Sequence, residues 1–177
     1  MTFQETPIPG VWLIEPERFE DERGWFARTF DREEFRARGL DYEVVQCNAS
    51  YNTKRDTLRG MHYQAEPHGE SKLVRCVRGA IFDVALDLRR DSSTYLAWHG
   101  VELSADNGHA LYIPAGLAHG FQTLRDDSEV LYQMGQAYVP EAARGVRFDD
   151  PAFAIEWPEA RDRIVSERDA GYADFAP

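Results

Sequence analysis

Two histidines stand in sequence contexts that would suit a polar site. His62 lies in the segment 58–64, where Gly60, His62 and Gln64 would share one face of an alternating strand. A histidine between a glycine and a glutamine on one face points towards a polar or concave place, although a hydrogen-bonded core histidine would give the same pattern. His119 ends a Pro-x-Gly-x-x-His segment that begins at Pro114, and this composition forces a tight turn before the next strand. Metal binding is therefore the first chemistry to weigh.

The spacing around His119 is similar to the second motif of cupin barrels, in which that histidine often binds a metal. The first cupin motif usually supplies His-x-His followed by a glutamate, whereas the matching segment here reads His62-Tyr63-Gln64. Divalent ions prefer three or four nitrogen or oxygen ligands. The other histidines, His68, His99 and His109, have no such spacing. We therefore expect a barrel that holds no catalytic metal.

Other polar residues have ordinary explanations when each is taken alone. Lys72 at the head of a strand fits a solvated lysine, and strand tyrosines such as Tyr132 usually pack in a core. Arg23 and Arg59 each precede a glycine, an arrangement that suits surface arginines and also phosphate clamps. The sequence contains no Walker loop, dinucleotide fingerprint or Gly-x-Ser-x-Gly elbow.

The elements that would position these side chains are mainly strands. In the range 80–88 the even positions are apolar and the odd ones include Asp83 and Asp87, which is the period of two of a β-strand. The range 129–138 alternates too and places Tyr132 and Tyr138 on one face. Further strands are expected at 72–77, 98–103 and 110–113. Several short strands indicate an all-β sandwich, jelly roll or barrel, whose interior is a natural small-molecule site.

Two short helices are expected. The first runs from Asp31 to about residue 38, because Asp31 and Glu34 have capping-box spacing and Gly39 provides a stop. The second begins near Ser166, and Asp169, three residues on, would stabilise its first turn.

Composition limits the class of protein. The 177 residues are 43% hydrophobic and 29% charged, which suits a single domain over residues 1–177. A net charge of −11, from 20 basic and 31 acidic residues, argues against nucleic acid or an anionic membrane as partner. There is no signal peptide pattern and no apolar run near the ~20 residues that would span a bilayer. Cys47 and Cys76 cannot form a disulfide framework, so we expect a cytoplasmic protein.

Taken together, the motifs resemble one family. They include Phe19-x-Asp21-x-Arg23-Gly24-x-Phe26, Gln46-x-Asn48-x-Ser50, Leu58-Arg59-Gly60-Met61-His62-Tyr63-Gln64, Lys72-Leu73-Val74, Leu131-Tyr132, Tyr138-x-Pro140 and Ser166-x-x-Asp169. Their order and spacing, over almost the whole chain, are similar to those of the dTDP-4-dehydrorhamnose 3,5-epimerases, metal-free sugar-nucleotide epimerases of the cupin superfamily. The resemblance implies a cupin-type jelly-roll β-barrel with a few short helices and no cofactor.

The resemblance also implies roles for the catalytic residues. His62 would be the base that removes a proton next to the C4 ketone of the sugar, and Asp169 would orient its imidazole. Tyr132 would be the acid on the other side of the ring. Lys72 would stabilise the enolate oxygen at C4.

The same resemblance implies a binding end and a partner subunit. Arg59 and Arg23 would hold the diphosphate, and the nucleobase would rest near Phe26 and Tyr138. Gln46 and Asn48 would lie near the base, while Asp83 and His119 would complete the polar lining. In the family the N-terminal strand region is exchanged between two subunits, so the resemblance implies a homodimer in which Arg23 and Phe26 serve the partner's site.

Three positions depart from the family pattern. The family usually has Glu where Arg28 stands, Ser at position 52 instead of Asn52, and often Lys instead of Gln133. Arg28 would lie near the nucleobase, so the departure leaves the nucleotide open.

The expected reaction is epimerisation at C3 and C5 of dTDP-4-dehydro-6-deoxy-D-glucose to dTDP-4-dehydro-L-rhamnose. The alternatives are a single-centre epimerase acting on another nucleoside-diphosphate 4-keto-6-deoxy sugar, a ketoisomerase, and a non-catalytic sugar-nucleotide-binding cupin.

Overall fold

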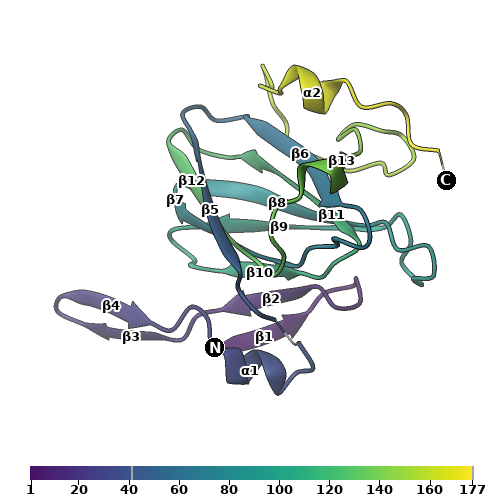
Figure 1. Ribbon diagram of the computed structural model, residues 1–177. Helices are drawn as coiled ribbons and strands as arrows, with labels where there is room; N and C mark the ends of the chain where they lie inside the picture. The colour runs from purple at the N-terminus through teal and green to yellow at the C-terminus, as the bar shows by residue number, and fades with distance from the viewer. Residues whose placement is uncertain (41, 177) are drawn as a thin grey trace.

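Short antiparallel strands bounded by turn residues build two sheets that face each other (Figure 1). The computed structural model describes residues 1–40 and 42–176. One sheet has six strands in the order β1 (Thr2–Glu5), β2 (Trp12–Glu15), β10 (Ala110–Ile113), β7 (Lys72–Arg78), β12 (Ser128–Met134) and β5 (Gln46–Asn52). The other has five, in the order β13 (Ala143–Gly145), β6 (Leu58–Gln64), β11 (Leu117–Thr123), β8 (Ala80–Asp87) and β9 (Trp98–Ser104). The expected all-β class is confirmed.

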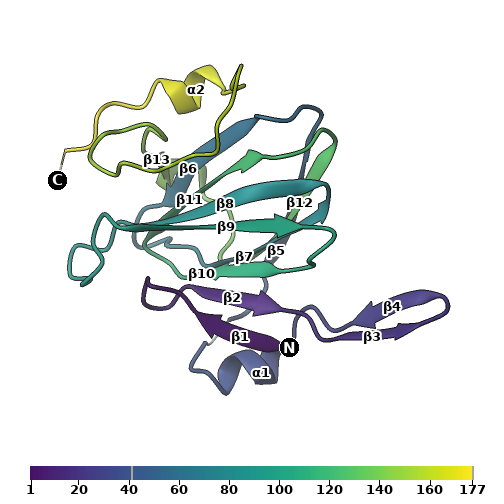
Figure 2. The same ribbon diagram turned by 180° about the vertical axis from the view of Figure 1, so that it is seen from behind.

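Three apolar clusters hold the two sheets and their coverings together. The central cluster lies between the sheets and includes Val74 and Val130 from one sheet and Ile81 and Phe121 from the other. A second cluster covers the outer face of the six-stranded sheet, where Phe35 of the first helix is fully buried. The third covers the outer face of the five-stranded sheet with the segment after β13, whose yellow-green trace is seen in Figure 2.

Strand β8 is covered on both faces, so its alternation of apolar and polar residues does not separate a core face from a solvent face. Its even positions, such as Val84 and Leu86, belong to the outer cluster under the C-terminal segment. Its odd positions Ile81 and Ala85 belong to the cluster between the sheets, and Asp83, between them, is completely buried. The alternation therefore predicts the strand correctly, but its polar face points into the interior rather than to solvent.

The helices begin where their caps are expected and are short. Helix α1 (Arg32–Arg36) starts after Asp31, whose carboxylate accepts hydrogen bonds from the backbone N–H groups of Glu33 and Glu34. Helix α2 (Glu167–Ala170) starts after Ser166, whose hydroxyl accepts from the N–H of Asp169. A 3₁₀ turn, η1 (Pro140–Ala142), precedes β13.

The expected strand over 129–138 is wrong at its C-terminal end. Strand β12 ends at Met134, and the N–H of Gly135 donates to the carbonyl of Ser71 as the chain leaves the sheet. Tyr138 therefore lies in the following loop and does not share a strand face with Tyr132.

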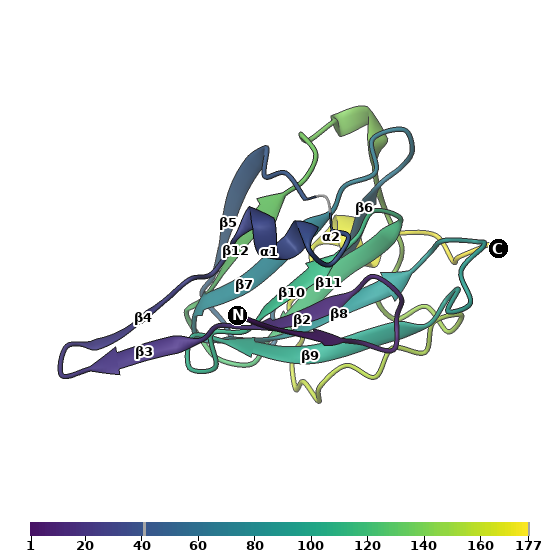
Figure 3. The same ribbon diagram turned by 90° about the horizontal axis from the view of Figure 1, so that it is seen from below.

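A two-stranded ribbon of β3 (Arg18–Asp21) and β4 (Gly24–Ala27) projects from the body of the molecule (Figure 3). It carries large apolar side chains in solvent: Phe19 is 61% exposed, Trp25 48% and Phe26 73%. Such a patch is unusual for an isolated soluble chain and marks an interaction surface. Within the described residues, no helix is both long and apolar enough to cross a membrane.

Candidate active site

A cavity of about 670 Å³ lies between the two sheets and collects most of the residues singled out from the sequence. All four candidate catalytic residues line it: His62, Lys72, Tyr132 and Asp169. His62 comes from the five-stranded sheet, whereas Lys72 and Tyr132 come from the six-stranded sheet. Side chains from opposite walls thus face the same space.

His62 and Asp169 form a hydrogen-bonded pair at this cavity. The distance from His62 Nε2 to Asp169 Oδ1 is 2.7 Å. The imidazole is 43% exposed, whereas the carboxylate is only 6% exposed. Burial alone would raise the pKa of Asp169, but the hydrogen bond from His62 and the charge of His62 outweigh it, so the pKa is lowered. An ionised Asp169 can only accept a hydrogen bond, so His62 Nε2 is the donor of this pair and Nδ1 is the ring nitrogen that is left to act as a base.

Gly60 supports this pair through its backbone. Its N–H donates to the second oxygen of Asp169, Oδ2, at 3.2 Å. Gly60 has a φ of +134°, and a Cβ at this position would lie 2.5 Å from the Cα of Gly120. Only glycine allows the backbone to approach the neighbouring strand and the carboxylate this closely.

The pairing of β6 with β11 is irregular next to Gly60. His119 pairs with His62 but Phe121 pairs with Arg59, so the register shifts between them. As a result Arg59 and His62, three residues apart, both reach the cavity. A strictly alternating strand would have sent them to opposite faces, which is why the expected face of Gly60, His62 and Gln64 does not describe the whole strand.

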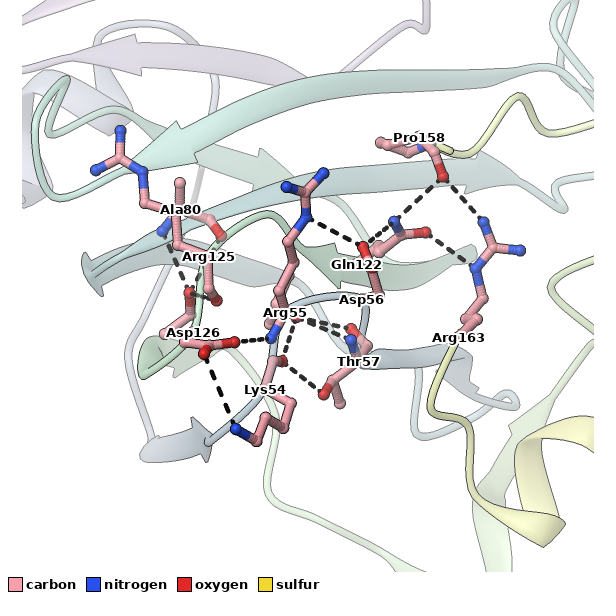
Figure 4. A network of polar contacts seen from close by, with 12 residues as sticks. Lys54, Arg55, Asp56, Thr57, Ala80, Gln122, Arg125, Asp126, Pro158 and Arg163 are labelled. Carbon is pink, nitrogen blue, oxygen red and sulfur yellow. Dashed lines mark hydrogen bonds and ion pairs between the residues drawn. The ribbon is translucent and has the colours of Figure 1, made fainter. Parts of the chain in front are cut away.

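The C-terminal segment that carries Asp169 is tied to β11 and to the residues just before β6 by a polar network (Figure 4). Thr57 and Ile164 form a parallel bridge, and the N–H of Ile164 donates to the carbonyl of Asp56 at 3.0 Å. Arg163 Nε donates to Gln122 Oε1 at 3.0 Å, and both side chains also donate to the carbonyl of Pro158. This clamp lies just before Ser166 and fixes where α2 begins.

Tyr132 and Lys72 stand on the other wall of the cavity. The hydroxyl groups of Tyr132 and Ser50 lie 3.3 Å apart. Burial raises the pKa of Tyr132, although the hydrogen bond with Ser50 opposes this, so the phenol is protonated at neutral pH. Lys72 Nζ donates to Glu70 Oε1 at 2.5 Å. The sequence motifs imply no role for Ser50 or Glu70, although Glu70 stands only two residues before Lys72.

His119 and Asp83 form a second, more deeply buried pair. Their Nε2 and Oδ1 atoms are 2.7 Å apart, and the side chains are 5% and 0% exposed. The His119 ring lies edge-on to Tyr132, with centroids 6.0 Å apart. His119 lines the cavity, whereas Asp83 stands behind it and does not.

Four of the residues expected at the binding end lie at the cavity as well. Arg59, Gln46, Asn48 and Tyr138 all line it. Gln46 donates to Asn48 Oδ1 at 3.0 Å and accepts from the backbone N–H of Tyr138 at 3.2 Å, so it connects β5 to the loop after β12.

Asn52, one of the departures from the family pattern, has a structural role here. Its side-chain oxygen accepts a hydrogen bond from Arg59 Nε at 2.8 Å, and its amide nitrogen donates to the carbonyl of Ser128. Asn52 is buried and thereby fixes the direction of the Arg59 guanidinium.

Three expected residues do not meet the cavity within a single chain. Arg23 and Phe26 lie on the projecting ribbon, where Arg23 pairs with Asp21 in solvent. Arg28 follows the ribbon, and its Nη1 lies 2.8 Å from Asp31 Oδ2. The third departure, Gln133, is next to Tyr132 on β12 and therefore lies on the other face of the strand. It does not line the cavity.

No metal centre is found in the part of the chain that the structure describes. Among residues 1–40 and 42–176, no group of three or more His, Cys, Asp or Glu side chains could hold a metal ion. The chemistry that these residues can perform themselves is proton transfer, with a histidine–carboxylate pair, a protonated phenol and a lysine around one cavity.

Comparisons with known proteins find similar sequences over almost the whole chain. The model of the dTDP-4-dehydrorhamnose 3,5-epimerase family matches residues 5–176. A curated dTDP-4-dehydrorhamnose 3,5-epimerase of Sinorhizobium fredii is 45% identical over 170 residues, which are 96% of this chain and 87% of the relative.

Solved structures give the same result. The dTDP-4-dehydrorhamnose 3,5-epimerase of Elizabethkingia anophelis superposes with a TM-score of 0.95 at 38% identity and covers 99% of this chain and 96% of its own. The Legionella pneumophila dTDP-6-deoxy-D-glucose-3,5-epimerase, in complex with dTDP-4-keto-L-rhamnose, has a TM-score of 0.92 at 35% identity, with 97% and 90% covered. A 3'-monoepimerase of Streptomyces bikiniensis, in complex with dTDP-quinovose, has a TM-score of 0.88 at 34% identity, with 96% and 85% covered.

Proposed function

Because this chain belongs to the dTDP-4-dehydrorhamnose 3,5-epimerase family, with its cupin-type jelly roll, we propose how its own residues perform the reaction of an isomerase. The substrate is dTDP-4-dehydro-6-deoxy-D-glucose and the product is dTDP-4-dehydro-L-rhamnose, formed by inversion at C3 and C5. One observation carries the mechanism: the His62–Asp169 pair on one wall of the cavity faces Tyr132 and Lys72 on the other.

The first step is removal of a proton next to the C4 ketone. The Nδ1 atom of neutral His62 takes the proton from C3 or C5, and the electron pair of that C–H bond moves towards the carbonyl to form an enolate. Asp169 holds the ring by its Nε2–H group and stabilises the imidazolium that forms. The negative charge on O4 is stabilised by the ammonium group of Lys72.

The second step returns a proton to the opposite face of the same carbon. Tyr132 is protonated at neutral pH because burial raises its pKa, and it stands on the opposite sheet from His62. Its hydroxyl donates the proton, and the resulting phenolate recovers one from solvent while His62 releases its own. Two such cycles invert two centres, and no external reductant or oxidant is needed.

The nucleotide occupies the open end of the same cavity. The guanidinium of Arg59, held by Asn52, binds the diphosphate, and Gln46, Asn48 and Tyr138 surround the nucleobase. A local positive charge of this kind allows an acidic protein to bind an anionic substrate.

The partner of the projecting ribbon is a second copy of the chain. Phe26 is 73% exposed and Arg23 has an 85% exposed side chain, and neither residue lines the cavity of its own subunit. In a homodimer with exchanged ribbons, both residues reach the nucleotide end of the partner's cavity. The domain over residues 1–177 then works only as a pair.

The reaction is tested by proton NMR with the purified protein and dTDP-4-dehydro-6-deoxy-D-glucose in deuterated buffer. Deuterium at both C3 and C5 supports the proposal. Deuterium at C3 alone supports a single-centre epimerase, the activity that the name of the Streptomyces bikiniensis relative carries. A carbonyl that moves along the ring would indicate a ketoisomerase, and binding without exchange would indicate a binding module. The His62→Ala variant should bind substrate but lose exchange.

The dimer is tested by mixing two inactive variants during refolding. His62→Ala lacks the base, and Arg23→Ala lacks the ribbon contact. If ribbons are exchanged, mixed dimers contain one site with both residues intact, and about a quarter of the wild-type activity returns. If each site uses its own ribbon, mixing restores nothing.

A further inference from the structure

Glu70 forms a buried ion pair with Lys72 in the wall of the cavity. The distance from Lys72 Nζ to Glu70 Oε1 is 2.5 Å, and the two side chains are 6% and 9% exposed. Both residues line the cavity. Acidic side chains are rarely buried unless they are paired, so the position of Glu70 needs an explanation beyond surface solubility.

The environment of Lys72 explains why a carboxylate is needed there. Lys72 is the first residue of β7 and lies on the same strand face as Val74, which belongs to the central apolar cluster. Its partners on the two neighbouring strands are Ile113 and Met134. Burial lowers the pKa of the Lys72 amine, whereas the charge and hydrogen bond of Glu70 oppose this loss.

The other polar groups around this part of the cavity come from different strands. Asp83 on β8 adds a second, smaller effect that favours the charged amine. Tyr132 on β12 is protonated, and His119 on β11 is held by Asp83. Glu70 is therefore the carboxylate in direct contact with the lysine and the dominant source of opposing charge.

We propose that Glu70 is a positioning residue: its carboxylate fixes the ammonium group of Lys72 in the cavity wall and keeps it positively charged. This inference rests on the proposed function, in which Lys72 faces the enolate oxygen. Within residues 1–40 and 42–176, Glu70 takes one of the three N–H donors of Lys72, so two remain for the substrate. Without Glu70, the buried amine would lose its proton at a lower pH and could no longer stabilise a negative oxygen.

The sequence offers a direct way to observe this charge. Lys54 and Lys72 are the only lysines in the chain, and the Lys54 side chain is 66% exposed. Protein labelled with ¹³C,¹⁵N-lysine therefore gives two side-chain signals in an NMR pH titration, and Lys54 serves as an internal reference.

The titration compares the wild type with Glu70→Gln, which keeps the shape but removes the charge. We expect the midpoint of Lys72 to fall by more than about one pH unit while Lys54 is unchanged. Glu66→Gln, the same change at an exposed position in the same loop, should leave both midpoints in place. An unchanged Lys72 midpoint in Glu70→Gln would overturn the proposal.

Two additions keep the result interpretable. If Glu70→Gln does not fold, Glu70→Asp carries the test: a carboxylate set back by one methylene should lower the midpoint by a smaller amount, and no change would overturn the inference. The alkaline limb of kcat against pH should move with the Lys72 midpoint. A shifted midpoint with an unmoved limb would support charge control by Glu70 and remove Lys72 from the proposed mechanism.

Discussion

Replacing Asp169 by Asn tests how the carboxylate orients His62 more sharply than replacing His62 itself. The carboxylate of Asp169 accepts hydrogen bonds from two donors, Gly60 N–H and His62 Nε2–H, whereas an amide has only one acceptor oxygen. Gly60 N–H is a donor and needs the amide oxygen, as it now uses Asp169 Oδ2 at 3.2 Å. The amide NH₂ would then face His62 Nε2, which would have to accept a hydrogen bond. The proton of the neutral ring would move to Nδ1, and the base would lose its lone pair on the cavity side.

The size of the effect follows from these contacts. The reversed amide would place its NH₂ against the N–H of Gly60, and leaving such buried donors unsatisfied costs about 1–3 kcal/mol. The competent tautomer is therefore reduced roughly 5- to 160-fold. Loss of the charge-assisted bond that stabilises the imidazolium adds about 1.5–3 kcal/mol. Together these two effects, about 2.5–6 kcal/mol, predict a fall in kcat of about 70- to 25,000-fold for Asp169→Asn.

The assay is the rate of deuterium incorporation at C3, followed by proton NMR, with thermal unfolding to confirm that the variant is folded. A matched control is Asp150→Asn, because Asp150 is also buried in the C-terminal part of the chain, and its carboxylate accepts from the backbone N–H groups of Ala152 and Phe175 and lies outside the cavity lining. The control should lower stability and leave the rate of exchange close to wild type. A decrease of less than about tenfold in folded Asp169→Asn would refute the tautomer argument.

Two further predictions concern substrate binding and acid stability. Asn52→Ala removes the acceptor of Arg59 Nε, so we expect steady-state kinetics to show KM raised about fivefold, with kcat within about twofold, because about 1 kcal/mol of orientation is lost. An equal loss in kcat would contradict a role limited to binding. Burial would raise the pKa of Asp87, but hydrogen bonds from Arg89, Ser92 and Thr94 lower it to about 2. A carboxyl group whose pKa is lowered in the folded state stabilises the fold at pH values above its ordinary pKa of 3.8. This stabilisation is lost as the pH falls from 3.8 towards about 2. Denaturant unfolding should therefore show about 1–2 kcal/mol more acid destabilisation in the wild type than in Asp87→Asn, allowing for the partly exposed Arg89.

The strands could be predicted from the sequence because a strand with one mainly apolar face has a period of two, and because turns need Gly, Pro, Asn or Asp. The range 110–113 matches β10 at both ends, and Ser166 marks the start of α2 as expected. The sequence places the end of β12 too late, because Met134 and Tyr138 have the spacing of one strand face although the polar Gln136 lies between them. The backbone N–H groups of Tyr138 and Val139 donate to the side chains of Gln46 and Gln64 and not to a neighbouring strand, which shows that the chain has left the sheet.

The residues that line the site could mostly be predicted, but the contacts that hold their side chains in place could not. His62 and Asp169 are 107 residues apart, and only the fold brings their atoms together. The contact of Glu70 with Lys72 could not be predicted, because an acidic residue near a lysine usually lies on a solvated surface. The sequence does not show that either side chain is buried. The Arg59–His62 relation depends on an irregular register between β6 and β11, which no local pattern records. Arg23 and Phe26 lie on the projecting ribbon and do not line the cavity of their own chain, so their proposed role depends on a second copy.

The clamp between the C-terminal segment and β6 has a consequence for how the protein is made. His62 leaves the ribosome more than a hundred residues before Asp169, so a nascent chain can form most of the sheets while its histidine has no carboxylate to orient it. The bridge between Thr57 and Ile164, which places the segment that carries Asp169, can form only after residue 164 has been translated. A chain interrupted before Ser166 would keep most of the cavity but lack an oriented base. Catalytic competence is thus acquired late in synthesis, after the walls of the cavity are in place.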